Sequence, residues 1–530
     1  MKQNYAGSAL LGLAVVLAVA CTTSVARANV YVTNIKLNGA TNNPTVFAGN
    51  AVAISYILNE PASSGVTVKI LSGSTAVRTL AIAAGHAGTL RGLNTVTWDG
   101  KSDAGTPVAG GDYACSITAA ATGYSAWTQT TVDSNPGNQV WEPWGLAVNE
   151  NSNSFYYGRV FVANSYPGPT QSPMDLLGFQ KLNADGSPAD EGIYSSGGYA
   201  WNGSYSESPF RIKVGPDDRF YAEDWSGEGV IMSWDQQIST NSMLNVMTDY
   251  NNPGGNLGGF VVTGSGTNAQ LWMVDNTTGG YGLIRWNMQA DGTLANGDQG
   301  TQIIQVGGGS DLDDSAFDIA VDPAGRIYVA CEPSSDTQYK LMRFPAYSGT
   351  LLTTADWKMD NTTPSGNEFA IAVSADATRV GVALSVSNAL LILDASTGTT
   401  ITNIPVGNPA HAVAWDNVGN AYIAFDVNNA EALWQAWSPP GANQATTVAL
   451  ETIHVLPLPH ITGMTRTGST VTVNFTGPTS DPPTAFVLMS GSVVGGITNN
   501  AGASITGSGG TYQATVSSSA SAQYYRVMRP

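Results

Sequence analysis

Histidine and cysteine are scarce in this chain of 530 residues, which has four histidines and three cysteines. A hydrolase or lyase with a histidine base would depend on His411, the only histidine in the central region. No Gly-x-Ser-x-Gly elbow occurs. The sequence therefore contains no convincing catalytic constellation.

The cysteines also limit the covalent structure. Beyond the leader described below, only Cys115 and Cys331 remain. They fall in different expected domains, so we expect no stabilising disulfide between them.

Charged residues are also scarce. Charged residues make up 11% of the chain, with 39 Asp and Glu against 21 Lys and Arg. Such an acidic surface repels nucleic-acid phosphates and anionic membranes, so neither is an expected partner. Low charge with few aromatics would predict disorder, but 13 Trp and 21 Tyr indicate packed cores.

Long apolar runs are confined to the N-terminus, over residues 9–20. Residues 26–28 (Ala-Arg-Ala) match a small-x-small cleavage pattern, so we expect a signal peptide over residues 1–28. The alternative is lipoprotein processing at Cys21. The run is too short to span a bilayer, so no transmembrane segment is expected. The expected location is secreted, cell-surface or periplasmic, in a bacterium.

Glycine is abundant, at 60 residues, and short apolar strands alternate with turn residues along the chain. This profile predicts an all-β protein, and its length predicts three or four domains. The first is a β-sandwich over residues 29–133. Its pattern runs from Ile54-Ser55-Tyr56-Ile57 through Thr97-Trp98-Asp99-Gly100-Lys101-Ser102-Asp103-Ala104-Gly105 to Pro107-Val108-Ala109-Gly110-Gly111-Asp112-Tyr113.

These motifs resemble the FlgD-type immunoglobulin-like domain found in flagellar hook-capping proteins and in many secreted bacterial proteins. The resemblance covers roughly residues 45–125 and implies a fold rather than a catalytic role. Within it, Trp98 is expected to cap the core, while Asp99 and Asp103 hold their own turns. A calcium site at the two carboxylates is the alternative.

Six degenerate copies of one strand pattern follow residue 137. Their first strands are Gly145–Val148, Arg211–Val214, Gly259–Val262, Asp318–Val321, Ala370–Val373 and Ala412–Trp415. A repeat of about 50 residues with several strands predicts a β-propeller. We expect it over residues 138–452, with six blades and seven as the alternative. The rhythm resembles NHL-like six-bladed extracellular propellers. A small C-terminal β-sandwich is expected over residues 461–530.

Several residues differ in type from those at the same positions of the other copies and are candidate binding groups. Arg211, Lys213 and Asp318 replace small residues in the first strands and are candidates for the central channel, with a structural Arg–Asp pair as the alternative. His411 occupies a position that is aromatic in four of the other five copies, which favours packing.

Two loops add further candidates. Asp311, Asp313 and Asp314 form an acidic cluster that could hold calcium, with a solvated loop as the alternative. No other cofactor is indicated. The loop between the first two repeats carries aromatic side chains that could stack on a glycan or contact a protein, or could instead bury their own rings. These side chains are Tyr194, Tyr199, Trp201 and Tyr205.

Two functions are consistent with these observations. The first is an exported multidomain binding or scaffold protein, with the propeller as recognition platform for a glycan or an extracellular protein. The alternative is a secreted propeller lyase or hydrolase acting on a polysaccharide or lactone, since fold alone does not exclude an enzyme.

Overall fold

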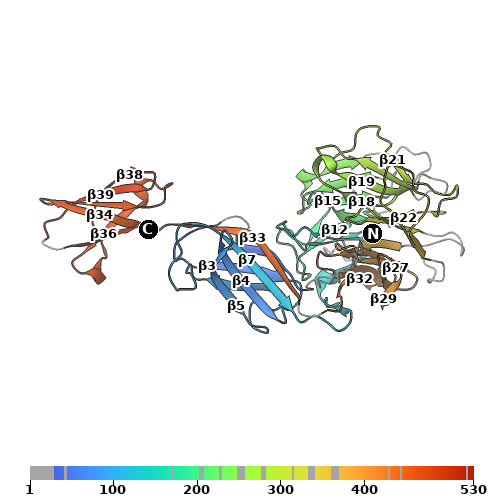
Figure 1. The fold of residues 1–530 in the computed structure, drawn as a ribbon, viewed down its shortest axis with the longest axis horizontal. Helices are drawn as coiled ribbons and strands as arrows, with labels where there is room; N and C mark the ends of the chain where they lie inside the picture. The colour runs from blue at the N-terminus through green and yellow to red at the C-terminus, as the bar shows by residue number, and fades with distance from the viewer. Residues whose placement is uncertain are drawn as a thin grey trace, which may run out of the picture.

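Three β-rich units follow one another in a row, with the propeller at one end, the immunoglobulin-like sandwich in the middle and the C-terminal module at the other end (Figure 1). The computed structural model describes residues 29–40, 44–169, 172, 175–201, 208–225, 230–247, 257–275, 282–312, 316–331, 341–359, 369–427, 430–441, 444–520 and 523–530. The signal peptide expected over residues 1–28 lies outside these residues.

The sandwich packs a three-stranded sheet against a five-stranded sheet, as the period-two alternation of its strands requires. Apolar side chains from both sheets, Trp98 among them, form one core. The first sheet has the order β1 (Val32–Leu37), β3 (Val52–Leu58), β6 (Gly92–Trp98). The second has the order β2 (Thr45–Phe47), β33 (Gln444–Leu456), β7 (Gly111–Ala121), β4 (Gly65–Ser72), β5 (Thr75–Ile82).

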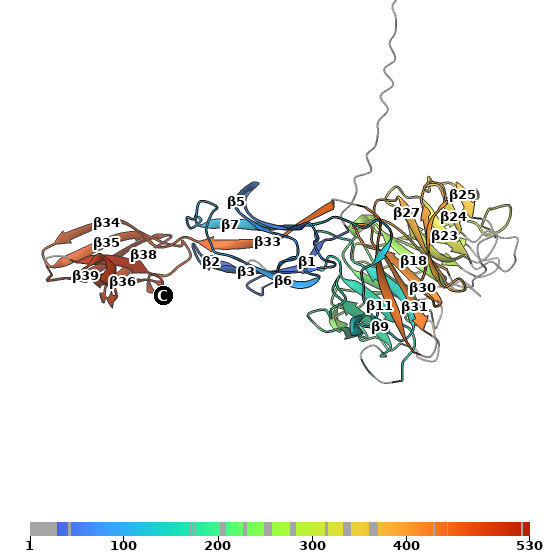
Figure 2. The same cartoon turned by 90° about the horizontal axis from the view of Figure 1, so that it is seen from below.

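Strand β33 comes from the far side of the propeller and completes the sandwich. It pairs antiparallel with β7 and parallel with β2, so it fills the position between them. In Figure 2 it runs along the sandwich toward the C-terminal module. The propeller is therefore an insertion between two neighbouring strands of the sandwich.

The turn after Trp98 is held as the sequence suggests, but with one difference. The Asp99 carboxylate accepts a hydrogen bond from the Lys101 backbone N–H, and Gly100 adopts a φ of 71° where a Cβ would overlap the Asn50 backbone. Asp103 instead accepts from the Thr79 N–H of the neighbouring β5. Both carboxylates thus bind backbone within the sandwich.

Six antiparallel sheets form the blades of the propeller, five with four strands and the sixth with a short fifth strand, and each first strand lies near the axis. Every expected first strand is confirmed as the innermost strand of a sheet. Blade 1 holds β10 (Pro143–Val148), β11 (Val160–Asn164), β12 (Gly178–Leu182) and β13 (Tyr194–Ser195); blade 2 holds β14 (Ile212–Val214), β15 (Phe220–Asp224), β16 (Val230–Trp234) and β17 (Leu244–Met247); blade 3 holds β18 (Leu257–Thr263), β19 (Gln270–Asp275), β20 (Gly282–Asn287) and β21 (Thr301–Ile304). Blade 4 holds β22 (Ala316–Val321), β23 (Ile327–Cys331), β24 (Leu341–Phe344) and β25 (Trp357–Met359); blade 5 holds β26 (Phe369–Val373), β27 (Arg379–Leu384), β28 (Ala389–Asp394) and β29 (Thr400–Pro405); blade 6 holds β30 (Ala410–Trp415), β31 (Ala421–Val427), β32 (Ala430–Ser438) and β8 (Thr128–Gln129).

A carboxylate turn joins the first two strands of several blades. In blade 4 the Asp322 carboxylate accepts hydrogen bonds from the backbone N–H groups of Ala324 and Arg326, and Gly325 has a φ of 80°. Equivalent turns are held by Asp217, Asp376 and Asp416. These Asp side chains therefore serve turn geometry.

The ring is closed by chain that precedes its first blade. The outer strand of blade 6 is β8, which pairs with the end of β32, and β9 (Gln139–Val140) pairs with the start of β32. β8 and β9 thus cover the outer edge of blade 6 and connect that blade to the segment that leads into blade 1.

Two strands thus lie outside the ranges expected for their domains. β8 belongs to the propeller although it precedes residue 133, and β33 belongs to the sandwich although it begins before residue 452. Their pairing partners are about 300 residues distant in the sequence.

The C-terminal module consists of two small sheets around a core that includes Phe475, Phe486 and Tyr512. One sheet has the order β34 (His460–Thr467), β35 (Thr470–Thr476), β39 (Thr511–Ser517), β38 (Ser504–Ser508). The other has the order β37 (Asn499–Asn500), β36 (Val487–Gly491), β40 (Tyr524–Met528).

The only helices among the described residues are short 3-10 turns. No helix in this part of the chain is long and apolar enough to cross a membrane. Cys115 and Cys331 lie in separate cores, and no disulfide joins them. The 3-10 turns are η1 (Pro136–Asn138), η2 (Thr240–Ser242), η3 (Gly266–Asn268), η4 (Pro483–Ala485) and η5 (Val494–Gly496).

Candidate functional site

Aromatic rings from several blades close one end of the propeller axis. Trp144, Phe210 and Phe317 form a cluster of their own, with ring centroids 5.7–5.8 Å apart between neighbours. The His411 ring packs tilted against Trp144 with 4.5 Å between the ring centroids; His411 is 5% exposed and places Nε2 3.0 Å from the Asp426 carboxylate. His411 therefore belongs to a packing layer, as its aromatic siblings suggest.

The next layer along the axis is filled by Arg211 and Asp318. Their side chains are 2% and 1% exposed, and the Arg211 Nε lies 3.7 Å from the Asp318 Oδ2. Arg211 Nη1 also donates to the backbone carbonyls of Trp144 and His411, both at 2.7 Å. Asp318 accepts from the Ile371 N–H at 3.0 Å. The pair therefore links blades 1, 2, 4, 5 and 6 across the axis.

Small residues in the same layer create the room for this pair. The other first strands carry Gly or Ala at the position of Arg211 and Asp318. A Cβ at Gly259 would overlap the Asp318 carboxylate, so blade 3 needs glycine there. This layer is the axial plug, formed by Arg211 and Asp318 with the small residues Gly145, Gly259, Ala370 and Ala412.

Beyond the axial plug the channel is open. A cavity of about 690 Å³ is lined by the first strands of all six blades and reaches their first turns. Residues two positions after the plug contribute to it, and exposed turn residues such as Pro216 and Pro323 surround its mouth. Two indoles, Trp272 and Trp415, lie in its wall, and each donates its Nε1–H within the protein.

Lys213 enters this cavity from blade 2. The residues at its position in the other blades are all apolar: Ala147, Val261, Ala320, Ala372 and Ala414. Burial lowers the pKa of the Lys213 ammonium, while the nearby Asp318 carboxylate opposes this shift. Arg211 and Lys213, both singled out by the sequence, thus have different surroundings, one in the plug and one in the cavity.

Sequence reasoning missed one ionisable group beside them, Glu223. It lies on β15 opposite Arg211, is fully buried, and neither carboxylate oxygen has a hydrogen-bond partner among the described residues. Burial raises its pKa well above the usual value, although Arg211 acts in the opposite direction. Its siblings Ala163, Val274, Ala330, Ala383 and Ala424 are apolar, and this contrast was a readable signal.

The aromatic loop between blades 1 and 2 turns its rings inward. Trp201 is 8% exposed, packs with Phe179 and Trp234 in a propeller core, and donates to the Ser196 carbonyl. Tyr199 donates to Asp224 at 2.7 Å, and Tyr194 donates to the Leu177 carbonyl. Tyr205 lies outside the described residues. The described rings therefore pack on the propeller rather than forming an open stacking surface.

Asp311 is engaged within the propeller. Its two carboxylate oxygens accept hydrogen bonds from Lys358 and from the Ala355 N–H, which lower its pKa although burial opposes them. Asp313 and Asp314 lie outside the described residues. Among the residues described, no group of three or more His, Cys, Asp or Glu side chains could hold a metal ion.

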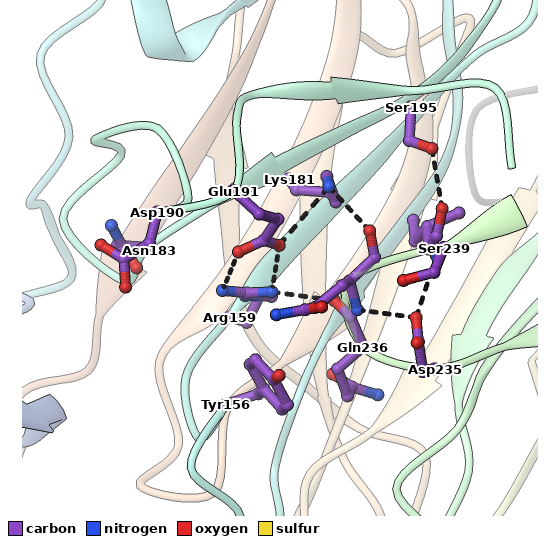
Figure 3. Close-up of polar contacts among 12 residues, drawn as sticks. Tyr156, Arg159, Lys181, Asn183, Asp190, Glu191, Ser195, Asp235, Gln236 and Ser239 are labelled. Atoms are coloured by element: carbon purple, nitrogen blue, oxygen red, sulfur yellow. Dashed lines mark hydrogen bonds and ion pairs between the residues drawn. The ribbon is translucent and has the colours of Figure 1, made fainter. Parts of the chain in front are cut away.

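A second charged cluster joins blades 1 and 2 near the sandwich (Figure 3). Arg159 binds both oxygens of Glu191, at 2.5 and 3.2 Å, and Lys181 lies 3.4 Å from the same carboxylate. Arg159 also donates to the Gln236 carbonyl, and Lys181 to the Gln237 carbonyl. The Arg159 and Lys181 side chains are only 4% exposed. Their contacts with protein groups indicate a structural role.

The sandwich and propeller share a buried joint. The hydroxyls of Tyr31 and Tyr422 lie 3.2 Å apart, and Asn420 donates to the Asn29 carbonyl. Glu60, 1% exposed, accepts from Tyr124 at 2.7 Å; burial raises its pKa to about 7. Burial likewise raises the pKa of Asp416 to about 6. Sequence reasoning did not single out these two carboxyl groups.

The profile of the FlgD Ig-like domain matches residues 39–123. This stretch is a FlgD Ig-like domain, followed in the chain by the propeller. A search of curated protein sequences finds no significant match.

Solved structures of propeller proteins resemble the chain. The Cps50 (Swd1) β-propeller domain of Myceliophteria thermophila is 9% identical, with 56% of this chain and 83% of that chain covered and a TM-score of 0.34. Regucalcin of Agrobacterium tumefaciens, described as calcium-binding, is 11% identical, with coverages of 58% and 94% and a TM-score of 0.34. AztD of Citrobacter koseri is 15% identical, with coverages of 69% and 87% and a TM-score of 0.24. These similarities do not indicate which ligand the protein binds.

Proposed function

We propose that the protein is an exported bacterial binding protein whose propeller receives a ligand in the axial cavity. The observation that carries the proposal is the cavity of about 690 Å³ bounded by all six first strands. Ligand pockets commonly measure about 300–1,000 Å³ and have mostly apolar walls with a few polar groups. This cavity fits that description, with Lys213 as an ionisable group that enters it from a first strand.

The position of the cavity supports binding rather than packing. The axial plug already joins the blades at one level of the channel, so the open volume beyond it is not required to close the ring. Export is proposed from the sequence of residues 1–28.

The other functions have weaker support. A glycan or protein platform built on Tyr199 and Trp201 would require open rings, whereas both rings pack inward. A propeller lyase or hydrolase that used His411 would require it at the ligand, yet His411 does not line the cavity. A small ligand in the channel is therefore the preferred partner.

The test uses N-phenyl-1-naphthylamine, an uncharged apolar dye whose fluorescence rises in apolar surroundings. Saturable binding by the full chain is expected, and Ala372→Phe, which adds a ring to the cavity wall, should weaken it about tenfold or more, or about 1.4 kcal/mol. Ala109→Phe, in an exposed sandwich loop, is the matched control. Absence of saturable binding, or unchanged affinity in Ala372→Phe, would reject the cavity as the site.

A further inference from the structure

We infer that the ligand of the axial cavity is an apolar organic acid whose single anionic group faces Lys213. This inference rests on the proposed function and names its ligand class. It begins from the ring of residues two positions beyond the axial plug. Five of these six residues are Ala or Val, and Lys213 alone carries a charge. The aliphatic stem of this lysine can pack against the small apolar residues of the ring, but its ammonium needs a polar or charged partner.

Among the residues that the structure describes, no counter-charge is hydrogen-bonded to Lys213. No described residue forms an ion pair or hydrogen bond with its ammonium. The closest candidate, Asp318, is already paired with Arg211 and accepts the backbone N–H groups of Ile319 and Ile371. A partly buried cation without a partner is costly, and an anion at the same place offsets that cost.

Glu223 does not supply the missing charge either. Its carboxyl group is fully buried and accepts no hydrogen bond from the described residues, so burial favours its protonated form. Arg211 and Asp318 balance each other, and burial disfavours the charged form of Glu223. Asp318 favours the charged form of Lys213, which is therefore the basic group at the floor of the cavity, whereas Glu150 lines the cavity from the turn after β10.

Polar side chains that include Asn149, Glu150 and Gln270 also line the cavity, but the first strands favour an apolar body. The first strands present mostly aliphatic side chains and two indoles whose N–H groups are already used. Asp322, which also borders the cavity, is occupied by Arg326, Tyr328 and its own turn. A sugar would lose the hydrogen bonds of several hydroxyls here, and a cation would be repelled by Lys213.

Two dyes of nearly equal shape test separately whether the cavity binds an apolar body and whether it binds an anionic group. 8-Anilinonaphthalene-1-sulfonate is the sulfonated analogue of N-phenyl-1-naphthylamine, so the pair differs by one anionic group. The full chain is titrated with each dye, as wild type, Lys213→Met, Lys213→Arg and Lys69→Met. Lys69 is an exposed lysine of the sandwich and controls for the loss of one surface charge.

The expected result is specific to one dye and one lysine. Lys213→Met should weaken the sulfonated dye about tenfold and leave the neutral dye within about twofold, a difference of about 1 kcal/mol. Lys213→Arg and Lys69→Met should retain sulfonate binding. If the neutral dye binds in the cavity but the sulfonate is indifferent to Lys213→Met, the inference fails and the proposed function stands. If neither dye binds saturably, both fail.

Discussion

The guanidinium of Arg211 and the carboxylate of Asp318 lie 3.7 Å apart on the propeller axis, buried from solvent and contributed by blades that are not neighbours in sequence. Around them, backbone groups of three further blades form hydrogen bonds with the pair. The pair thus holds the ring together at its centre.

Removal of either charge of this pair should therefore lower the free energy of unfolding. Asp318→Asn leaves the Arg211 charge buried without its partner, and we expect a loss of about 3 kcal/mol or more in the free energy of unfolding, measured by urea denaturation. The double variant Arg211→Met/Asp318→Leu should lose less than the two single changes together, because no charge is left unpaired. Asp112→Asn, on an exposed carboxylate, is the control and should change stability little. Strict additivity in the double variant would contradict a coupled pair.

Ligand affinity should depend on pH through Glu223. Its pKa is raised by burial, so it is neutral at low pH and ionises as the pH rises through that pKa. Ionised Glu223 would offset the charge of Lys213, and Arg211, Asp318 and Asp224 complete the charged groups near it. Binding of the sulfonated dye should therefore weaken as the pH rises, and Glu223→Gln should flatten this profile in fluorescence titrations. An identical pH profile in Glu223→Gln would show that Glu223 is not the titrating group.

The joint between sandwich and propeller should make the folded protein more stable at acidic pH. Glu60 has its pKa raised from 4.5 to about 7, so its neutral form stabilises the folded state. This contribution is complete below pH 4.5 and is lost as the pH rises toward 7. Glu60→Gln should remove on the order of 2–3 kcal/mol of this pH dependence, seen as a smaller difference in Tm between pH 5 and pH 8. Asp416, with a pKa of about 6, acts in the same direction and remains in the variant. Equal pH dependence in both proteins would be inconsistent with this assignment.

The FlgD Ig-like domain should not fold from its contiguous residues alone. A polypeptide of residues 29–123 lacks β33 and exposes the facing edges of β2 and β7. We expect no cooperative thermal transition by circular dichroism, because two unpaired edges replace a central strand. A synthetic peptide of residues 444–456 should restore the transition, whereas a scrambled peptide of the same composition should not. A cooperative transition without peptide would show that β33 is dispensable.

Trp201 should contribute to stability and not to ligand affinity. Trp201→Ala removes a buried indole from a cluster with Phe179 and Trp234, so we expect a loss of about 3–5 kcal/mol in the free energy of unfolding. Affinity for the neutral dye should remain unchanged below the melting transition. Tyr166→Ala, at a ring that is 41% exposed, is the control. A stable variant with lost binding would instead support the aromatic surface.

The arrangement of blades was predictable because it depends on local periodicity. Each copy repeats an apolar first strand, a turn and a second strand, which has an aromatic residue in five of the six copies, and this pattern fixes the register of the strands. Comparison among copies also identified Arg211, Lys213 and Asp318, since a charge stands out where siblings are small. The same comparison would have revealed Glu223.

Long-range pairing was not predictable in this way. Nothing in residues 444–456 indicates that this segment pairs with β7 and β2, because partners hundreds of residues away leave no mark on the local pattern. The inward orientation of Trp201 depends on its packing against Phe179 and Trp234, and a polar, glycine-rich loop contains no periodicity that reveals it. The sequence could not show that Arg211 lies in the axial plug and Lys213 in the cavity, because these layers form only when the six first strands come together.

Strand β33 also determines how a mechanical load would pass through the protein. It is bonded along its length to β7, pairs at its end with β2, and leads directly to the C-terminal module. A pull on that module acts along the strand, so many backbone hydrogen bonds resist it together in shear. Such a load would therefore act first on the sandwich, because β33 is paired there before the chain reaches the propeller.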